Sequence, residues 1–140
     1  MRFAPLLGLI ALLCSSLVVA DDRASTAPAP IVTPLMTKPL QDYPNKEVLM
    51  LTVEYPPGAV ESAHRHDAHA FVYVLEGSIV MGVAGSEPVT LNPGQTFHEG
   101  PDDVHTIGRN ASKEKPAKFV VFLLKDRDKP AVIPVDDRKR

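Results

Sequence analysis

The feature that most constrains the fold is a regular alternation of short apolar runs with turn-forming residues. Runs rich in β-branched and aromatic residues follow one another at intervals of about ten residues, and glycine, proline or asparagine separates them. This pattern is typical of an all-β sandwich or barrel with little or no helix. We expect strands at 48–55, 59–66, 71–76, 78–83, 88–91, 96–98, 104–109 and 118–125.

The first twenty residues have the composition of a secretory signal peptide. Arg2 supplies a positive charge, the largely apolar run 6–20 follows, and small residues precede Asp21. The run is short for a membrane span, which takes about 20 residues. We therefore expect residues 1–20 to be cleaved and the protein to be exported to the periplasm or beyond the cell, with no stable membrane insertion afterwards.

Two segments flank the expected strands and differ from them in composition. Residues 21–44 contain several prolines and predict an extended lead-in, and residues 126–140 form a tail dense in charge and proline. Residues 45–125 are then a single barrel domain. The only cysteine, Cys14, lies in the expected signal, so the mature protein has no disulfide of its own. A net charge of −2 without a basic stretch argues against a nucleic-acid partner.

Three of the five histidines fall within six residues, in the stretch HRHDAHAFVYVLEG. Side chains at positions i and i+2 of a strand share a face, so His64 and His66 would lie side by side. Two imidazoles on one face are candidate metal ligands, and a third would complete a set with open positions for water, oxygen or substrate. Solvated histidines on a polar loop would have the same spacing.

Two groups of residues resemble the conserved motifs of the cupin superfamily. The matching residues are Gly58, His64, His66 and Gly77 in the first motif, and Pro93, Gly94, His105 and Asn110 in the second. The resemblance covers roughly residues 49–125. It implies a small double-sheet jelly-roll barrel, the double-stranded β-helix, with one divalent metal ion held by His64, His66 and His105. It also implies a homodimer.

The chain departs from the cupin pattern at one ligand position. The glutamate that the family places seven residues before Gly77 is Ala70 here, and a methyl group cannot bind a metal. The resulting three-histidine centre resembles those of cupin thiol dioxygenases and β-diketone-cleaving dioxygenases, which favours Fe(II). Zinc, manganese or nickel would suit the same ligands. Alternatively, Ala70 marks a weakened site with no catalytic role.

Two further histidines are less well placed by strand alternation. His69 would point outward if Ala70 points inward, but alternation is unreliable at the start of a strand, so His69 remains a candidate fourth ligand. His98 lies on the strand before the second motif. It is a candidate catalytic acid–base group if it faces the cavity, and an exposed side chain if it does not.

Several charged residues near the motifs have simpler interpretations. Glu61 lies three residues before His64, so alternation turns it away from the ligand face and predicts a solvated carboxylate. The alternative is a carboxylate that supports a metal ligand through a hydrogen bond. Glu99 and Asp103 flank a glycine–proline turn and are expected to be turn residues. Arg109 is a weaker candidate for recognising an anionic substrate.

The leading hypothesis is an exported metal-binding cupin that acts as a dioxygenase-like enzyme on a small organic molecule. The alternative is a binding module in which the same barrel holds a metal or a small-molecule ligand without turnover. A third hypothesis is a barrel whose histidines are structural or vestigial. An enzyme needs an acid–base group aimed at the open metal positions, and on sequence alone His98 is the only good candidate.

Overall fold

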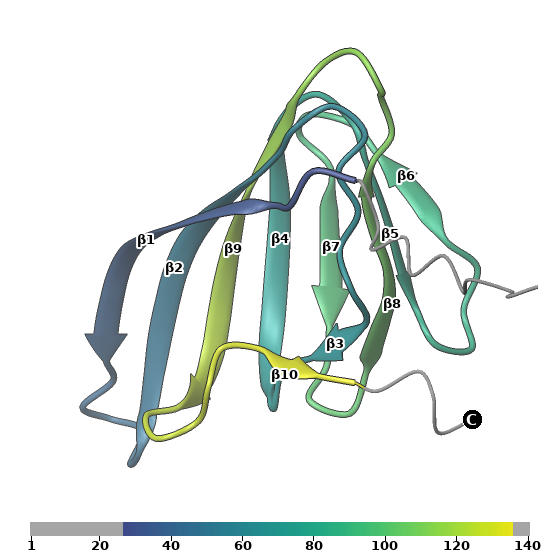
Figure 1. Cartoon of the computed structure of the whole chain (residues 1–140). Coiled ribbons are helices and arrows are strands. Elements are labelled where there is room, and N and C mark those ends of the chain that lie inside the picture. Colours follow the sequence, from purple (N-terminus) through teal and green to yellow (C-terminus); the bar gives the residue numbers. More distant parts are fainter. Residues whose placement is uncertain (1–26, 136–140) are drawn as a thin grey trace, which may run out of the picture.

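The computed structural model describes residues 27–135, which form ten strands in two five-stranded antiparallel sheets (Figure 1). The first sheet contains, in spatial order, β1 (Ile31–Pro39), β2 (Lys46–Tyr55), β9 (Ala117–Asp126), β4 (Ala68–Glu76) and β7 (Thr96–Glu99). The second contains β10 (Ile133–Pro134), β3 (His64–Arg65), β8 (Val104–Asn110), β5 (Ile79–Val83) and β6 (Val89–Leu91). This arrangement confirms the all-β jelly-roll fold.

The described residues contain no helix, and therefore none with the length and apolarity that crossing a membrane requires. The expected signal, residues 1–20, and the last five residues of the expected tail lie outside the described part of the chain.

The core lies between the two sheets and follows from strand alternation. Along β4 every second side chain is buried from Ala68 to Val74, while the side chains between them are exposed. β2 and β9 pair over their whole lengths and turn the same face inward. Their buried side chains on that face include Leu51, Val53 and Tyr55 from β2, and Phe119, Val121 and Leu123 from β9.

Two strands at the flanks were not foreseen. Residues 31–39 of the expected lead-in form β1, which pairs with β2 at the edge of the first sheet. Pro34 and Pro39 obscured this strand, because proline weakens a strand prediction although an edge strand tolerates it. The register shifts between Pro34 and Met36, so the strand accommodates its proline with an irregularity.

The second unforeseen strand comes from the expected tail. After β9 the chain turns back and crosses the end of the barrel to β10, which lies beside β3 (Figure 1). Pro134 pairs with His64 and Ile133 with Arg65. The C-terminal strand β10 therefore pairs with β3, the strand that carries His64.

The expected strand at 59–66 is largely absent. Only His64 and Arg65 form strand, and an isolated bridge between Val60 and Arg109 holds the segment before them against β8. The first histidine is thus reached through irregular chain, which matters for Glu61 below.

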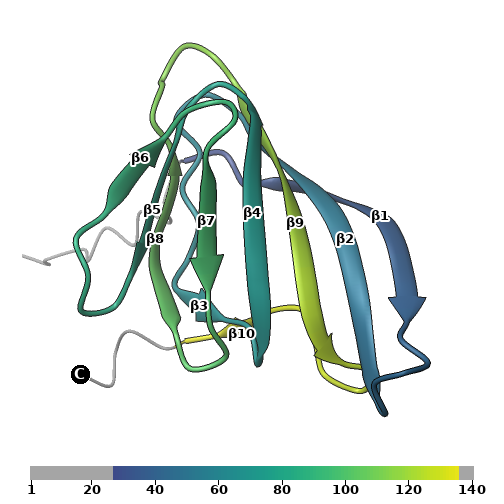
Figure 2. The ribbon, with the colours of Figure 1, turned by 180° about the vertical axis from the view of Figure 1, so that it is seen from behind.

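β4 and β7 lie side by side at the edge of the first sheet (Figure 2). Their register places Ala70 directly opposite Glu99 and Phe71 opposite His98. Because side chains alternate, the first pair faces the inside of the barrel and the second pair faces outward.

Candidate metal centre

Three imidazoles meet inside the barrel. His64 on β3 pairs directly with His105 on β8, and His66 follows just after β3. The ring centroid of His64 is 4.8 Å from that of His66 and 4.9 Å from that of His105. All three side chains are buried. The structure therefore brings together the three histidines that the sequence proposed as metal ligands.

Each of the three rings has one nitrogen fixed by a backbone carbonyl. Because a carbonyl oxygen only accepts hydrogen bonds, the bonded nitrogen must donate, and in the neutral form of such a ring the other nitrogen carries a lone pair. Such carbonyl contacts orient metal-binding histidines. The contacts are His64 Nδ1 to Ser62 O at 2.9 Å, His66 Nδ1 to Ala131 O at 2.6 Å and His105 Nε2 to Ile107 O at 2.7 Å.

Glu99 is a buried member of the cluster and not the turn residue that the sequence suggested. Its side chain is 2 % exposed. Oε2 lies 3.5 Å from His66 Nε2, and Oε1 lies 3.5 Å from His105 Nδ1. β7 continues one residue further than expected, and alternation from Phe97 then turns Glu99 inward.

Within the described residues, Oε2 of Glu99 has no hydrogen-bond partner. Burial, followed by the charges of Glu61 and Asp103, raises the pKa of the Glu99 carboxyl group to about 7. Near neutral pH the cavity thus holds a carboxyl group that a nearby cation would readily convert to its charged form.

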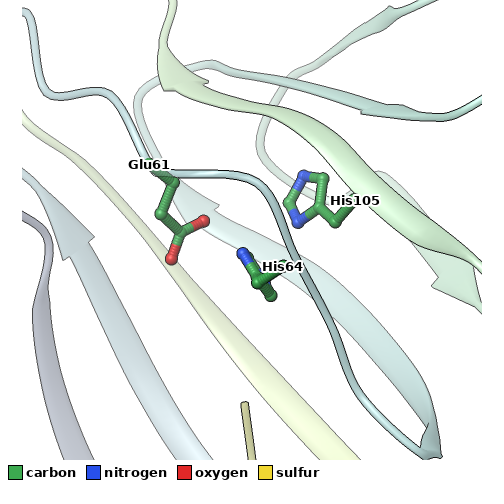
Figure 3. Close-up of side chains that lie close together, drawn as sticks. All are labelled: Glu61, His64 and His105. Carbon is green, nitrogen blue, oxygen red and sulfur yellow. The ribbon is translucent and has the colours of Figure 1, made fainter. Parts of the chain in front are cut away.

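Glu61 also points into the barrel, so the expectation of a solvated carboxylate is wrong. One carboxylate oxygen of Glu61 and one ring nitrogen each of His64 and His105 lie within 4.8 Å of one another. Figure 3 shows the three side chains directed toward a common space. Alternation failed here because residues between Val60 and His64 are not in a strand, so facing cannot be counted back from His64.

Tyr55 holds the carboxylate of Glu61 in place. The hydroxyl group of Tyr55 donates a hydrogen bond of 2.5 Å to Glu61 Oε2. Tyr55 is fully buried, and burial together with the adjacent charge of Glu61 raises its pKa far above the usual range. The hydroxyl group therefore stays protonated and remains a donor.

Gly108 provides the space for this arrangement. A Cβ atom at Gly108 would lie 2.7 Å from Glu61 Oε2, 2.9 Å from the Tyr55 hydroxyl oxygen and 3.0 Å from His105 Cε1. The carbonyl of Gly108 also accepts a hydrogen bond of 2.7 Å from the backbone N–H of Glu61. Glycine at this position of β8 lets the acid, the phenol and the imidazole meet.

The imidazoles are suited to metal binding near neutral pH. Burial is the largest cause that lowers the pKa of His66, and burial together with His64 lowers the pKa of His105 to about 4. A neutral imidazole is the form that binds a metal, so neither ring must lose a proton first.

His69 and His98 lie on the opposite face of the first sheet. His69 Nδ1 is 3.1 Å from His98 Nε2, the two rings are stacked, and both contact Phe71 on the outer surface. His69 is therefore not placed to be a fourth ligand. The expected cavity role of His98 is corrected as well, because Phe97 and Glu99 take the inward positions of β7.

The remaining candidates behave as structural residues. Asp103 Oδ2 accepts a hydrogen bond from Gly100 N at 2.7 Å, as expected for a turn. Arg109 is exposed and does not line the cavity. Asn110, from the second motif, is buried and donates to the carbonyl groups of Tyr55, Pro56 and Lys115.

The cluster opens into a cavity of about 100 Å³. Its polar lining consists of three imidazoles and two carboxyl groups, and no lysine or arginine of the described chain contributes to it. The other lining residues are Val32, Leu51, Val53, Ala70, Val72, Met81, Phe119, Val121, Leu123, Ala131 and Val132. This is a small apolar chamber with all its polar groups at one site.

The donor groups fit a divalent metal ion. Nitrogen and carboxylate oxygen atoms bound to one zinc-like ion at roughly 2.0–2.2 Å lie about 3.0–3.5 Å from each other. The separations of 3.5 Å between Glu99 and the rings of His66 and His105 agree with this. Three imidazoles and a carboxylate are also a donor set that iron, zinc, manganese and nickel accept.

Comparison with known proteins agrees with the fold and the motifs. Residues 51–123 match the family described as Cupin domain. Comparison with curated protein sequences gives no match.

Several solved structures are similar in fold. The DMSP lyase DddQ from Ruegeria pomeroyi is 22% identical with a TM-score of 0.56, over 63% of this chain and 43% of that one. An oxalate oxidase with the substrate analogue glycolate is 23% identical with a TM-score of 0.59, over 76% of this chain and 55% of that one. A Klebsiella pneumoniae protein with a double-stranded β-helix domain is 16% identical with a TM-score of 0.62, over 81% and 89%.

At these identities the structures show likeness of fold alone. The matched region also spans only about half of the lyase and of the oxidase.

Proposed function

The chain belongs to the cupin family, and from this premise we propose that it is an exported, metal-dependent enzyme that acts on a small organic molecule. The observation that carries the proposal is Glu61, a carboxylate held by Tyr55 beside His64 and His105 in a chamber whose remaining walls are mostly apolar. Outward-facing His98 alone would have favoured a non-catalytic binding module. Glu61 supplies the acid–base group that an enzyme needs.

His64, His66 and His105 would hold the metal ion through the nitrogens that the backbone carbonyl groups leave free. A divalent metal supplies Lewis-acid chemistry and, as Fe(II), redox chemistry with oxygen. Fe(II) is our preferred metal and a dioxygenase-like reaction our preferred chemistry, with zinc, manganese or nickel as the other candidates. The neutral state of His66 and His105 supports this ligand set.

Glu61 would accept or return a proton of the bound substrate. Its Oε2 accepts the hydrogen bond from Tyr55, which restrains the carboxylate, and Oε1 makes no part of this contact. Because the hydroxyl group of Tyr55 stays protonated, this support is present over the whole physiological pH range. The apolar walls keep water away from the reacting groups.

The chamber favours a small substrate with one polar end. About 100 Å³ holds a molecule of a few non-hydrogen atoms, and the polar groups lie together on one side. The substrate would bind through an oxygen or sulfur atom at this polar side and place its apolar part against residues such as Val72 and Phe119.

Export and self-association are further parts of the proposal. The signal-like composition of residues 1–20 supports export to the periplasm or beyond the cell. Exposed aromatic side chains on the outer face of the first sheet, Phe71, Tyr73 and Phe122, support a homodimer that covers them. Light scattering on the purified protein measures the molar mass and tests the proposed homodimer.

The test begins with elemental analysis of protein purified from the exported fraction, without a chelator or a histidine tag. We expect about one equivalent of metal in the wild type and in Glu61→Gln, and almost none in a variant with His64→Ala and His105→Ala. Wild-type protein that contains no metal and takes up none of the added metals would overturn the proposal.

The second step separates an enzyme from a binding module. The metal-loaded protein is incubated with small molecules that carry an oxygen or sulfur donor, and oxygen uptake and products are measured. We expect turnover by the wild type and a loss of roughly 100-fold or more in Glu61→Gln, the usual range for an acid–base group. Equal rates in both proteins would contradict the role of Glu61, and metal binding without turnover would identify a binding module.

A further inference from the structure

We propose that Glu99 on β7 is the carboxylate ligand of the metal and replaces, from the neighbouring strand, the glutamate that is missing at Ala70 on β4. The inference rests on the proposed metal centre and deepens it. It converts the three-histidine site predicted from the sequence into a site with three histidines and one carboxylate.

The first argument is the register of the two strands. Ala70 and Glu99 are direct partners in the antiparallel pair of β4 and β7, and both face the chamber with 1 % and 2 % exposure. Directly opposed residues have Cβ atoms about 4.5–5.5 Å apart, so a glutamate on either strand can reach the same space. The methyl group of Ala70 leaves that space to the side chain of Glu99.

The second argument is the direction of the carboxylate. Its two oxygens lie 3.5 Å from His66 Nε2 and from His105 Nδ1, and in each ring it is the other nitrogen that contacts a backbone carbonyl. Charge-assisted hydrogen bonds are shorter, at about 2.7–2.9 Å. The observed separations are longer than such hydrogen bonds. They agree with the distance between neighbouring ligand atoms around a common metal ion.

The third argument is the unsatisfied oxygen. Oε2 of Glu99 is buried without a hydrogen-bond partner in the described part of the chain. A buried carboxylate oxygen in this state is costly and needs an explanation. No lysine or arginine lines the chamber within the described residues, so neither of these permanent cations compensates it. A metal ion held by the adjacent imidazoles would do so.

Glu61 is the competing carboxylate, and its contacts distinguish it. Oε2 of Glu61 accepts the 2.5 Å hydrogen bond from Tyr55, whereas Oε2 of Glu99 has no hydrogen-bond partner among residues 27–135. The two carboxylates, one buried and one partly buried, therefore take two roles: Glu99 binds the metal, and Glu61 remains available for proton transfer. With Glu99 as a ligand, the site has one negatively charged ligand, which Ala70 cannot supply.

The test is a metal titration of the exported protein, freed of metal, with Co²⁺ and Zn²⁺, using a competing chromophoric chelator to obtain the affinity. The variants are Glu99→Gln, Glu99→Ala and the double variant Ala70→Glu/Glu99→Ala, which moves the carboxylate back to β4. Glu76→Gln, an exposed carboxylate on β4, is the matched control. The visible spectrum of the Co²⁺-loaded protein reports the ligand set independently of activity.

We expect both single variants at Glu99 to lose at least about 10-fold in affinity and to change the Co²⁺ spectrum. The double variant should recover most of the affinity, and Glu76→Gln should match the wild type. Thermal melts of the metal-free variants verify folding. If the double variant does not fold, the affinity of Glu99→Gln tests the inference, because glutamine is nearly isosteric with glutamate.

Wild-type affinity in Glu99→Gln would overturn the inference and leave the three-histidine centre standing. A folded double variant that binds no more tightly than Glu99→Ala would overturn the claim that the two positions share one place at the metal. Failure of the wild type to bind either metal would instead overturn the proposed function itself.

Discussion

The hydroxyl group of Tyr55, at the end of β2, donates a 2.5 Å hydrogen bond to Glu61, which lies in the irregular segment before β3. This contact joins a strand of the first sheet to the segment that leads into the second. It keeps a partly buried carboxylate beside the histidines, where burial without a partner would be costly. The position of Glu61 therefore depends on a residue that sequence patterning would assign only to the core.

Replacing Tyr55 by phenylalanine tests this dependence through stability against pH. The pKa of Tyr55 is raised in the folded protein, so its contribution to stability is complete below the unfolded pKa of about 10 and is lost as pH rises above that value. Wild-type protein should lose about 1.4 kcal/mol for each pH unit above 10 from this group alone. Tyr55→Phe should lack this loss.

Urea unfolding of both proteins at pH 8 and pH 11 measures the difference. At pH 8 we expect Tyr55→Phe to be less stable by about 1–3 kcal/mol, because Glu61 loses its donor. The gap should narrow at pH 11. A gap that stays constant or widens would show that Tyr55 ionises in the folded protein.

Gly108 offers a second test, because any side chain there would meet three groups of the site. Gly108→Ala should destabilise the protein by about 1–3 kcal/mol through overpacking and should weaken metal binding by displacing His105. Gly100→Ala is the control, since the nearest atom to its Cβ would be Asp103 Oδ2 at an ordinary 3.5 Å. Equal metal affinity in both variants would contradict the proposed role of Gly108.

Much of the fold and part of the site followed from sequence patterns with a local cause. The strands of the barrel core were predictable because glycine and proline turns delimit runs of alternating apolar residues. His64 and His105 were recognisable because the residues around them resemble the two cupin motifs, whereas the spacing of His64 and His66 alone also fits solvated histidines. The structure then shows why they meet, since they are direct partners on β3 and β8.

The two carboxylates were missed for different physical reasons. Glu61 follows a single bridge and precedes a strand of two residues, so no periodicity relates its direction to that of His64. Glu99 did carry a signal, because extending the strand 96–98 by one residue puts Phe97 and Glu99 on one face and His98 on the other. Its partnership with Ala70 depends on register between segments far apart in the chain, which sequence periodicity does not contain.

The C-terminal segment contacts the proposed metal centre directly, and removal of this segment should weaken metal binding. The carbonyl of Ala131 is the hydrogen-bond partner of His66 Nδ1 at 2.6 Å, and Ala131 and Val132 line the chamber. A chain that ends at residue 130 should therefore bind Co²⁺ about 10–100-fold more weakly while keeping its β-sheet circular dichroism. A chain that ends at residue 135 retains these contacts and should bind as the full chain does. If the two truncations bind equally well, the orientation of His66 does not depend on Ala131.

The histidine pair on the outer face provides the internal control for the whole site. His69 and His98 contact each other and Phe71, and they lie on the face of β4 and β7 that is turned away from the chamber. Elemental analysis of His69→Ala and His98→Ala should therefore give the wild-type metal content, whereas His66→Ala should lose most of it. Because all three substitutions remove one imidazole, the comparison separates the position of a histidine from its mere presence. Loss of metal in His98→Ala but not in His66→Ala would mean that the ion binds outside the barrel and that the chamber is not the metal centre.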